Sequence, residues 1–387
     1  MVMMTDDLAN NPNNPHPGTL INKPDGSDVY KGTPKDYTGS TVTGANFLKV
    51  IAGDKEGLQG TGSGKVLESG PEDNVFIYFA DHGGPGILGM PSGPLLKAKD
   101  LVDTLVDAAK ANRFKKMVIY VEACESGSIF KGLIPDDLNI YVMTAANEKE
   151  SSWGYYCPGM HPPPPAEYST CLGDLFSIAW LENADANDLS KETLEEQFKE
   201  VRDRTSQNGT YVQGSHVQQF GTVSWEKTEP CADFMGAAKP QARAAPAEAL
   251  EGAAVEQREA DLVSLRAVYA AAAPGPRKDR AKAELDAEVA FRAGLDAKIA
   301  AVVDQAIANK KVVPSVRAEF AASVFNALVP EGEPLTRDWE CFGKLVDTFD
   351  EQCGGLGQYG MKYGRAFANA CNRGLEREFL DAVAQQC

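Results

Sequence analysis

The chain has 387 residues, 43% of them hydrophobic and 24% charged, which is typical of a globular protein with two domains and a sizeable core. Its net charge of −17 argues against nucleic acid as a partner, because a protein that neutralises phosphates needs a basic surface. No run of about 18 apolar residues occurs, so the sequence predicts no membrane-spanning helix. The first residues lack the basic region of a signal peptide.

Strand and helix signals alternate over residues 1–236. Short apolar runs predict strands at 1–4, 74–80, 116–121 and 139–144, and helical spacing predicts helices at 43–52, 95–112, 172–181 and 191–205. A strand–helix–strand unit gives parallel neighbours in a sheet. We therefore expect an α/β domain with a mostly parallel sheet flanked by helices.

The composition changes after this region. Residues 237–256 are rich in alanine and proline, which predicts a linker or activation peptide. Residues 257–387 repeat alanine, leucine and valine at helical spacing, which predicts an all-α C-terminal domain.

Two of the predicted strands lead into reactive side chains. Residues 75–80 run into His82, and residues 117–121 run into Cys124, each with glycine close behind. Because the carboxyl ends of parallel strands share one edge of a sheet, these two side chains can face one cleft. A cysteine attacks as its thiolate, which a nearby imidazole promotes, and the N–H groups of Gly83 and Cys124 can stabilise an oxyanion. The alternative is a satisfied core histidine and an inert buried cysteine.

The eight cysteines are unevenly distributed. Cys157 and Cys171 bracket a proline-rich loop, and four others fall between residues 341 and 387. No Cys-x-x-Cys pair occurs, so we expect no zinc site, and nothing indicates another metal or a cofactor. The clustering favours disulfides, with free buried thiols as the alternative, and three connectivities are open for the last four cysteines. Asn208 begins an Asn-Gly-Thr glycosylation sequon.

Several segments carry a family resemblance. The main ones are Asp81–Gly83, Glu122–Gly127, Met143–Ser152 and Cys171–Asp174, with further matches at Asp36–Gly39, Gly62–Pro71 and Gln358–Lys362. They resemble the legumains, the asparaginyl endopeptidases or vacuolar processing enzymes among the caspase-like cysteine proteases, and the loop from residue 157 to 171 is similar to that of plant and algal members. The resemblance implies a caspase-like α/β domain followed by a helical prodomain.

The resemblance also implies a role for each matching residue. Cys124 would be the nucleophile and His82 its partner, with Gly83 and Cys124 as the oxyanion hole. The pocket for the residue before the scissile bond would be lined by Glu122, Ser151, Ser152 and Asp174. Carboxylates suit asparagine there, because they accept hydrogen bonds from its carboxamide NH₂, and a protonated aspartate can imitate asparagine at low pH. Without the resemblance, a structural salt bridge at Glu122 and a helix N-cap at Asp174 would be the simpler interpretations.

A zymogen follows from the same resemblance. The helical prodomain would cap the active site near neutral pH and leave on acidification, as carboxylates paired across the interface lose their charge. The implied disulfides are Cys157–Cys171, Cys341–Cys371 and Cys353–Cys387. The implied location is the vacuole or lysosome, reached by the secretory pathway.

The N-terminus departs from the family pattern. Met1–Asp7 matches the family's second strand, so the signal peptide, the first strand, an asparagine that orients the imidazole and an arginine that binds the carboxamide oxygen are absent from this sequence. In the family's sheet that first strand lies between the second and third. Its absence predicts two exposed strand edges, an opened core and an incomplete pocket. We therefore expect an inactive or unstable fragment of a longer gene product.

Three functions compete. The first is a cysteine endopeptidase that cleaves protein and peptide substrates after asparagine, and after aspartate at acid pH, and binds its own prodomain. The second is a peptide asparaginyl ligase, in which an amine rather than water resolves the acyl-enzyme. The third is a catalytically dead relative that acts by binding. A metacaspase-like protease fits less well, because its pocket for basic residues needs other carboxylates and no helical tail.

Overall fold

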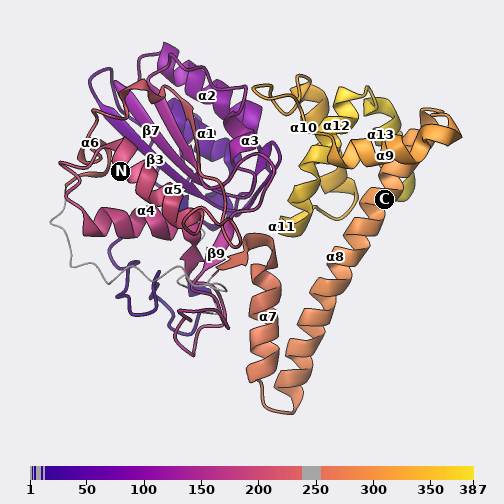
Figure 1. The fold of residues 1–387 in the computed structure, drawn as a ribbon, viewed down its shortest axis with the longest axis horizontal. Coiled ribbons are helices and arrows are strands. Elements are labelled where there is room, and N and C mark those ends of the chain that lie inside the picture. The colour runs from indigo at the N-terminus through magenta and orange to yellow at the C-terminus, as the bar shows by residue number, and fades with distance from the viewer. Residues whose placement is uncertain (1, 3, 6–9, 12–13, 238–253) are drawn as a thin grey trace.

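The computed structural model describes residues 2, 4–5, 10–11, 14–237 and 254–387. Figure 1 shows a sheet flanked by helices, a long helical hairpin that projects away from it, and a cluster of helices that returns beside the sheet. The predicted architecture, an α/β domain with a mostly parallel sheet followed by an all-α region, is confirmed. Most of the predicted linker (residues 238–253) lies outside the described residues.

The central sheet has four strands in the order β11-β8-β7-β3. They are β3 (Asn74–Ala80), β7 (Lys116–Glu122), β8 (Ile140–Thr144) and β11 (Gln218–Gly221). The first three are parallel, as the strand–helix–strand pattern predicts, and β11 adds antiparallel to β8. β7 is buried from Met117 onward because helices cover both faces of a parallel sheet.

Alternate residues of β7 face opposite helical layers. Met117, Ile119 and Val121 pack with α1 (Gly44–Ala52), α2 (Ala98–Lys110) and α3 (Gly127–Phe130). Val118 and Tyr120 pack with α4 (Leu175–Ala186) and α5 (Leu194–Thr205). The short α6 (Ala232–Met235) follows on the second face. This period of two fixes the register of the strand, because a slip of one residue would exchange the two faces.

β3 forms the free edge of this sheet within the described part of the chain. β1 (Met4–Thr5) pairs only with β2 (Tyr37–Thr38) in a separate two-stranded sheet. A cavity of about 1970 Å³ is lined by residues of β1, α1, β3 and α4. The side chain of Tyr78, in the middle of β3, is 39% exposed there.

Two small sheets border the carboxyl ends of the central strands. One contains β4 (Gly83–Gly84), β5 (Ile87–Leu88) and β6 (Leu96–Lys97). The other has the order β10-β9-β12, with β9 (Trp153–Tyr155), β10 (Gly173–Asp174) and β12 (Ala254–Glu256). β12 comprises the last three residues of the predicted linker.

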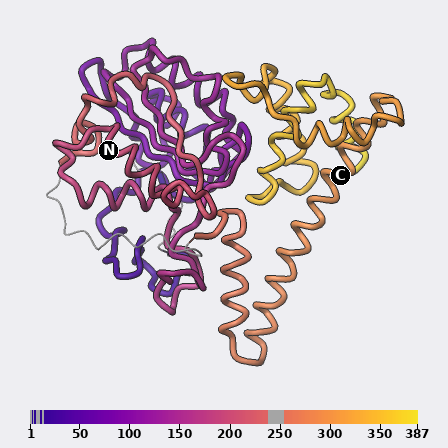
Figure 2. Tube along the Cα trace, in the orientation of Figure 1, coloured from indigo at the N-terminus to yellow at the C-terminus, as the bar shows by residue number. Residues whose placement is uncertain are grey.

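The C-terminal region is helical throughout its described residues apart from its connecting turns. It comprises α7 (Ala260–Ala271), α8 (Pro276–Asn309), α9 (Arg317–Asn326), α10 (Trp339–Gln352), α11 (Gly357–Gly360), α12 (Gly364–Asn372) and α13 (Glu376–Gln386). Among the described residues, 3-10 turns also lie at η2 (Gly39–Thr41), η3 (Val223–Trp225), η4 (Gln257–Glu259), η5 (Pro314–Val316) and η6 (Met361–Tyr363). The first two helices form the projecting hairpin, which the tube in Figure 2 follows without interruption.

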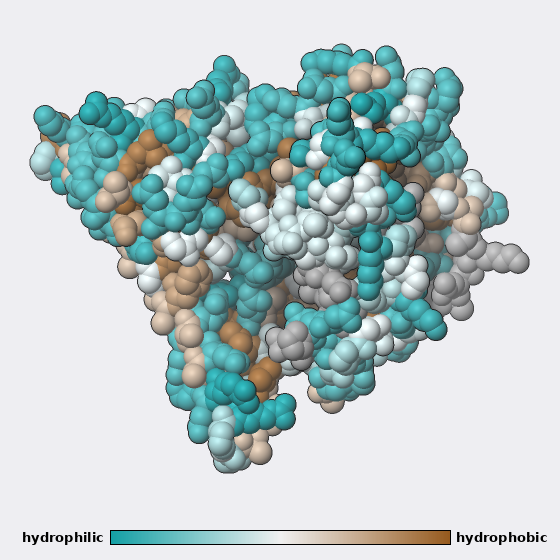
Figure 3. All heavy atoms as spheres, turned by 180° about the vertical axis from the view of Figure 1, so that it is seen from behind, coloured by the Kyte–Doolittle hydropathy of each residue, from teal (hydrophilic) through white to brown (hydrophobic). Residues whose placement is uncertain are grey.

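One apolar core unites the second half of α8 with α9 to α13. Ile87 of β5 belongs to this core, so the peptidase region contributes a side chain to the helical one. Two disulfides, Cys341–Cys371 and Cys353–Cys387, staple the helices. Seen from behind, the molecule has a mainly hydrophilic surface that is interrupted by apolar patches (Figure 3). In the helical C-terminal region, apolar residues such as Val289 and Val313 are exposed.

The sequence located most elements to within a few residues. The strands at 74–80, 116–121 and 139–144 and all four predicted helices of the first region are present, with α4 running five residues further than expected, to Ala186. The predicted strand at 1–4 lies partly outside the described residues. β9 to β12 were not predicted because each is short and finds its partner far away in the chain. None of the described helices is both long and apolar enough to cross a membrane.

Candidate active site

Cys124 and His82 follow the carboxyl ends of neighbouring parallel strands. β3 and β7 pair in register up to Ala80 and Glu122, so each reactive residue comes two positions after a paired one. The turns touch at Gly83, where a Cβ would lie 2.4 Å from the carbonyl oxygen of Cys124. Only glycine permits this approach, which brings the backbone of Gly83 beside the nucleophile candidate.

A single carboxamide links the two side chains. Gln257 Oε1 lies 2.8 Å from His82 Nδ1 and 3.7 Å from Cys124 Sγ. The cysteine also contacts the hydroxyls of Ser151 at 3.5 Å and Ser152 at 3.6 Å. The sequence analysis predicted that the other four residues, His82, Cys124, Ser151 and Ser152, belong to one site. It missed Gln257, which follows an alanine-rich segment and is part of no motif.

The segment around Gln257 adds as a strand to the site. β12 pairs antiparallel with β9 at Ala254–Tyr155, Val255–Gly154 and Glu256–Trp153. The pairing continues where Gln257 N donates to the Ser152 carbonyl at 2.9 Å. We call residues 254–259 the blocking segment, because they cover Cys124, which is only 1% exposed.

Burial keeps the thiol neutral in this arrangement. Desolvation raises the pKa of Cys124, and the Glu125 carboxylate raises it further, whereas the Arg258 guanidinium lowers it. A thiolate is the reactive form of cysteine. The covered site therefore holds the nucleophile candidate in its unreactive state.

Arg258 is the most unusual residue of the blocking segment. It is only 9% exposed, yet it is charged. Its guanidinium donates to Glu125 Oε1 at 3.0 Å and Oε2 at 2.5 Å, to Ser151 Oγ at 2.9 Å and to the Gly83 carbonyl at 2.8 Å. A bidentate pair of this kind compensates the burial of both charges.

Two interacting carboxyl groups, Glu122 and Asp174, lie at the end of β7 and directly before α4. Glu122 Oε2 accepts hydrogen bonds from the N–H and hydroxyl of Ser177, both at 2.8 Å, while its Oε1 has no partner in the described part of the chain. Burial and the neighbouring Asp174 raise the pKa of Glu122 well above its usual range. Burial and Asp81 raise the pKa of Asp174 to about 7. Asp174 does occupy the N-cap position of α4, but its side chain makes no cap hydrogen bond.

Ser151 and Ser152 are held by a network behind the cysteine. Glu150 Oε1 accepts hydrogen bonds from Asn147 N at 3.1 Å and His216 N at 2.7 Å, and the His216 ring lies 2.9 Å from Oε2. Glu125 N donates to the Glu150 carbonyl at 2.8 Å. These bonds fix the loop that carries both serines relative to the turn that carries Cys124.

The other singled-out residues lie outside this cluster. Asn208 is exposed in a turn at the end of α5. Cys157 and Cys171 form a disulfide that closes the proline-rich loop, so the structure contains the three pairs that the resemblance implies. Cys231 is a buried free thiol on the opposite face of the sheet from α2.

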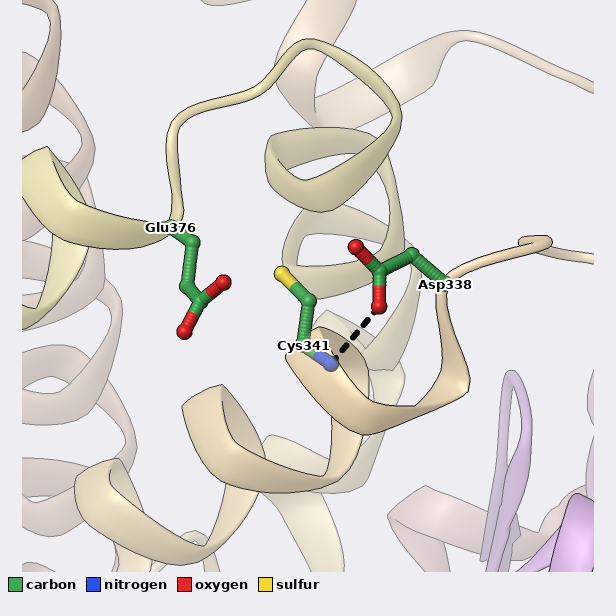
Figure 4. Close-up of side chains that lie close together, drawn as sticks. All are labelled: Asp338, Cys341 and Glu376. Carbon is green, nitrogen blue, oxygen red and sulfur yellow. Dashed lines mark hydrogen bonds between the residues drawn. The ribbon is translucent and has the colours of Figure 1, made fainter.

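One cluster elsewhere has the composition of a metal site but other roles. Asp338, Cys341 and Glu376 converge between α10 and α13 (Figure 4). Cys341 is engaged in its disulfide, Asp338 Oδ1 caps α10 by accepting from Cys341 N at 3.0 Å, and Glu376 pairs with Lys344 at 2.6 Å. A disulfide sulfur is not the thiolate that a metal needs, so this group does not fit a cation.

Comparisons with known proteins identify the family of this chain. Residues 1–237 match the Peptidase C13 family and residues 283–387 the legumain prodomain. The chain is 48% identical to the vacuolar-processing enzyme beta-isozyme of Arabidopsis thaliana, over 99% of this chain and 77% of that protein. It is 44% identical to a vacuolar-processing enzyme of Vicia sativa and 43% identical to the legumain of Canavalia ensiformis, covering 78% and 80% of those proteins.

A caspase-1 structure from Spodoptera frugiperda aligns with 48% of this chain and 71% of that chain at 13% identity and a TM-score of 0.33, which adds nothing to the fold described above. The family match spans the peptidase region, and the named relatives span the whole chain. The family match and the named relatives both describe a cysteine-type endopeptidase with its own prodomain. The chain belongs to the Peptidase C13 family, the legumains.

Proposed function

We propose that this protein cleaves peptide bonds after asparagine, and after aspartate at acid pH, through Cys124 and His82. The observation that carries the proposal is the position of the Gln257 carboxamide, whose oxygen contacts both His82 and Cys124. The segment that carries Gln257 adds a strand beside β9. A carboxamide side chain on an added strand is the form in which an asparagine substrate would arrive.

The chemistry follows from the positions of the groups. Once the blocking segment has left, His82 takes the proton of Cys124, and the thiolate attacks the backbone carbonyl carbon of the substrate's asparagine. The N–H groups of Gly83 and Cys124 stabilise the oxyanion. The imidazolium then protonates the leaving amine, and water, deprotonated by His82, hydrolyses the thioester.

Specificity comes from the carboxyl groups of Glu122 and Asp174. Burial and Asp81 raise the pKa of Asp174 to about 7, so it is largely protonated near pH 6, and burial raises the pKa of Glu122 in the same direction. A protonated carboxyl offers one donor and one acceptor, which matches the acceptor and donor of a carboxamide. A substrate side chain without these groups would leave buried polar atoms unpaired, and this costs binding energy.

The blocking segment and the C-terminal helices make the protein a zymogen. Pairs that join the two regions include Lys97–Asp347 at 2.5 Å, Lys131–Glu331 at 3.0 Å and the hydrogen bond from Arg365 to the Glu148 carbonyl. These contacts hold the helices against the peptidase region while the chain is intact. Because the relatives are named for vacuolar processing, we place the protein in the vacuole.

The test is cleavage of an Ala-Ala-Asn reporter by the full chain at mildly acidic pH. Cys124→Ser should reduce the rate by a factor on the order of 10⁴ or more, as removal of a nucleophile does. Cys231→Ser is the matched control, since Cys231 is also buried and free but lies away from the site. Cleavage that survives Cys124→Ser, or a wild-type chain that never cleaves, would sink the proposal.

A further inference from the structure

The guanidinium of Arg258 occupies a preformed site beside the nucleophile. Glu125, its main partner, is 6% exposed and directly follows Cys124 with a left-handed φ of 46°. Its backbone N–H and carbonyl are both engaged, with the Glu150 carbonyl and with Ser128 N, each at 2.8 Å. The turn that presents the cysteine therefore also fixes the carboxylate.

The register of the blocking segment places this site after the scissile bond. Gln257 N pairs with the Ser152 carbonyl, and the Gln257 side chain reaches His82 and Cys124. Arg258 is the next residue along the chain. A substrate that adds to β9 in the same direction, with asparagine in the place of Gln257, brings its following residue to the position of Arg258.

We propose that Glu125, the hydroxyl of Ser151 and the carbonyl of Gly83 form a guanidinium-binding subsite that favours substrates with arginine directly after the scissile bond. This inference rests on the proposed endopeptidase function and extends it to the leaving side of the substrate.

Removal of the blocking segment creates the need for such a ligand. Glu125 then loses its bidentate partner, and Arg365 of α12, whose charge also acts on it, leaves with the helical region. A substrate arginine restores the bidentate pair with this carboxylate, which alanine cannot do.

The geometry selects arginine over lysine. Two nitrogens of Arg258 donate to four acceptor atoms on three residues: the two carboxylate oxygens of Glu125, the hydroxyl of Ser151 and the carbonyl of Gly83. The planar fork of a guanidinium meets such a set at once, whereas an ammonium is a point charge.

The experiment compares peptides that contain Ala-Ala-Asn followed by arginine, citrulline, lysine or alanine, cleaved by the full chain at the pH of the reporter assay. Citrulline has the shape of arginine without its charge. We expect kcat/KM for arginine to exceed that for citrulline by about 10-fold or more, as a charged hydrogen-bonded pair implies. A peptide with arginine one position further on controls for general attraction of cations to an acidic protein and should gain less than about 2-fold.

Two variants locate the effect. Glu125→Gln should bring the arginine and citrulline rates within about 2-fold of each other. Glu182→Gln should keep the wild-type ratio, because Glu182 also pairs with an arginine, Arg204 at 2.7 Å, but lies on α4 outside the subsite.

The outcomes are distinct. Equal rates for arginine and citrulline in the wild-type chain overturn the subsite and leave the endopeptidase function intact, and this comparison does not depend on whether any variant folds. A ratio that persists in a folded Glu125→Gln chain also overturns it. A wild-type chain that cleaves none of the peptides overturns the proposed function and the subsite together.

Discussion

The blocking segment and the helical region are attached to the peptidase region by different kinds of contact. The segment is held by backbone pairing with β9 and by the Arg258–Glu125 pair, whose side chains are both 8% exposed. The helices are attached partly through ion pairs at the surface, such as Lys131–Glu331, in which the glutamate side chain is 88% exposed. Water and salt screen the second kind far more than the first.

The difference separates two steps of activation. Ion pairs at the surface weaken gradually as salt is added, whereas the buried pair and the strand pairing are lost together when the segment leaves. The helical region therefore sets the conditions for release, and the blocking segment decides whether the nucleophile is accessible. The following changes test that division, from the largest expected effect to the smallest.

The most decisive change converts the blocking segment into a substrate. Gln257→Asn shortens the side chain by one methylene, so the carboxamide can no longer rest on His82 and Cys124 and instead fits the carboxyl-lined pocket. We expect the chain to cut itself after residue 257 at mildly acidic pH, which mass spectrometry of the fragments would show.

The control for this change is the double variant Gln257→Asn with Cys124→Ser, which should stay intact. If the single variant also stays whole under conditions in which the wild-type chain cleaves the reporter, the blocking segment does not lie in the substrate's register.

Removal of the buried cation should open the site. Arg258→Ala leaves Glu125 buried without its partner, which costs about 3 kcal/mol or more. Iodoacetamide should then alkylate Cys124 on the order of 100-fold faster at neutral pH, as followed by intact mass.

The matched control is Arg204→Ala, because Arg204 pairs with Glu182 at 2.7 Å in a partly exposed position. It should change the rate of alkylation by less than about 2-fold. Equal protection of Cys124 in the Arg258→Ala chain would mean that strand pairing alone covers the thiol.

The pocket should respond to pH through Asp174. Its pKa is raised to about 7, so the proton that can donate to a carboxamide oxygen is present below pH 7 and lost above it. We expect the KM of the asparagine reporter to fall about 3- to 10-fold between pH 8 and pH 6, the value of one neutral hydrogen bond.

Asp174→Asn removes the titration and keeps both a donor and an acceptor, so its KM should vary little with pH. A wild-type KM that is independent of pH over this range would rule out Asp174 as the source of acid-dependent binding.

The smallest effect should come from the interface between the regions. Lys97→Ala breaks the pair with Asp347, whose side chain is 43% exposed, and should weaken docking of the helices by about 0.5 kcal/mol at low salt and less at high salt. The pH at which reporter cleavage begins should rise slightly. Lys99→Ala, which breaks an exposed pair within α2, should leave it unchanged.

The sequence revealed the parts of this site that come from local patterns. β3 and β7 were predictable because continuous apolar runs mark strands covered on both faces, and their ends fixed the positions of His82 and Cys124. Gln257 and Arg258 were not predictable. Both belong to the single turn η4, which follows the three-residue strand β12. That strand pairs with β9, about 100 residues earlier in the chain, and no residue pattern encodes such a pairing.

The disulfides have a consequence for what happens after the chain is cut. Each one lies within either the peptidase region or the helical region, and none described here joins the two. While the chain is continuous, the helices dock at an effective concentration set by the length of the tether, whatever the dilution. A cut between residues 237 and 254 turns the same contact into a bimolecular complex. Its inhibition then depends on the volume into which the two pieces are released, so a compartment that dilutes the helices makes activation irreversible.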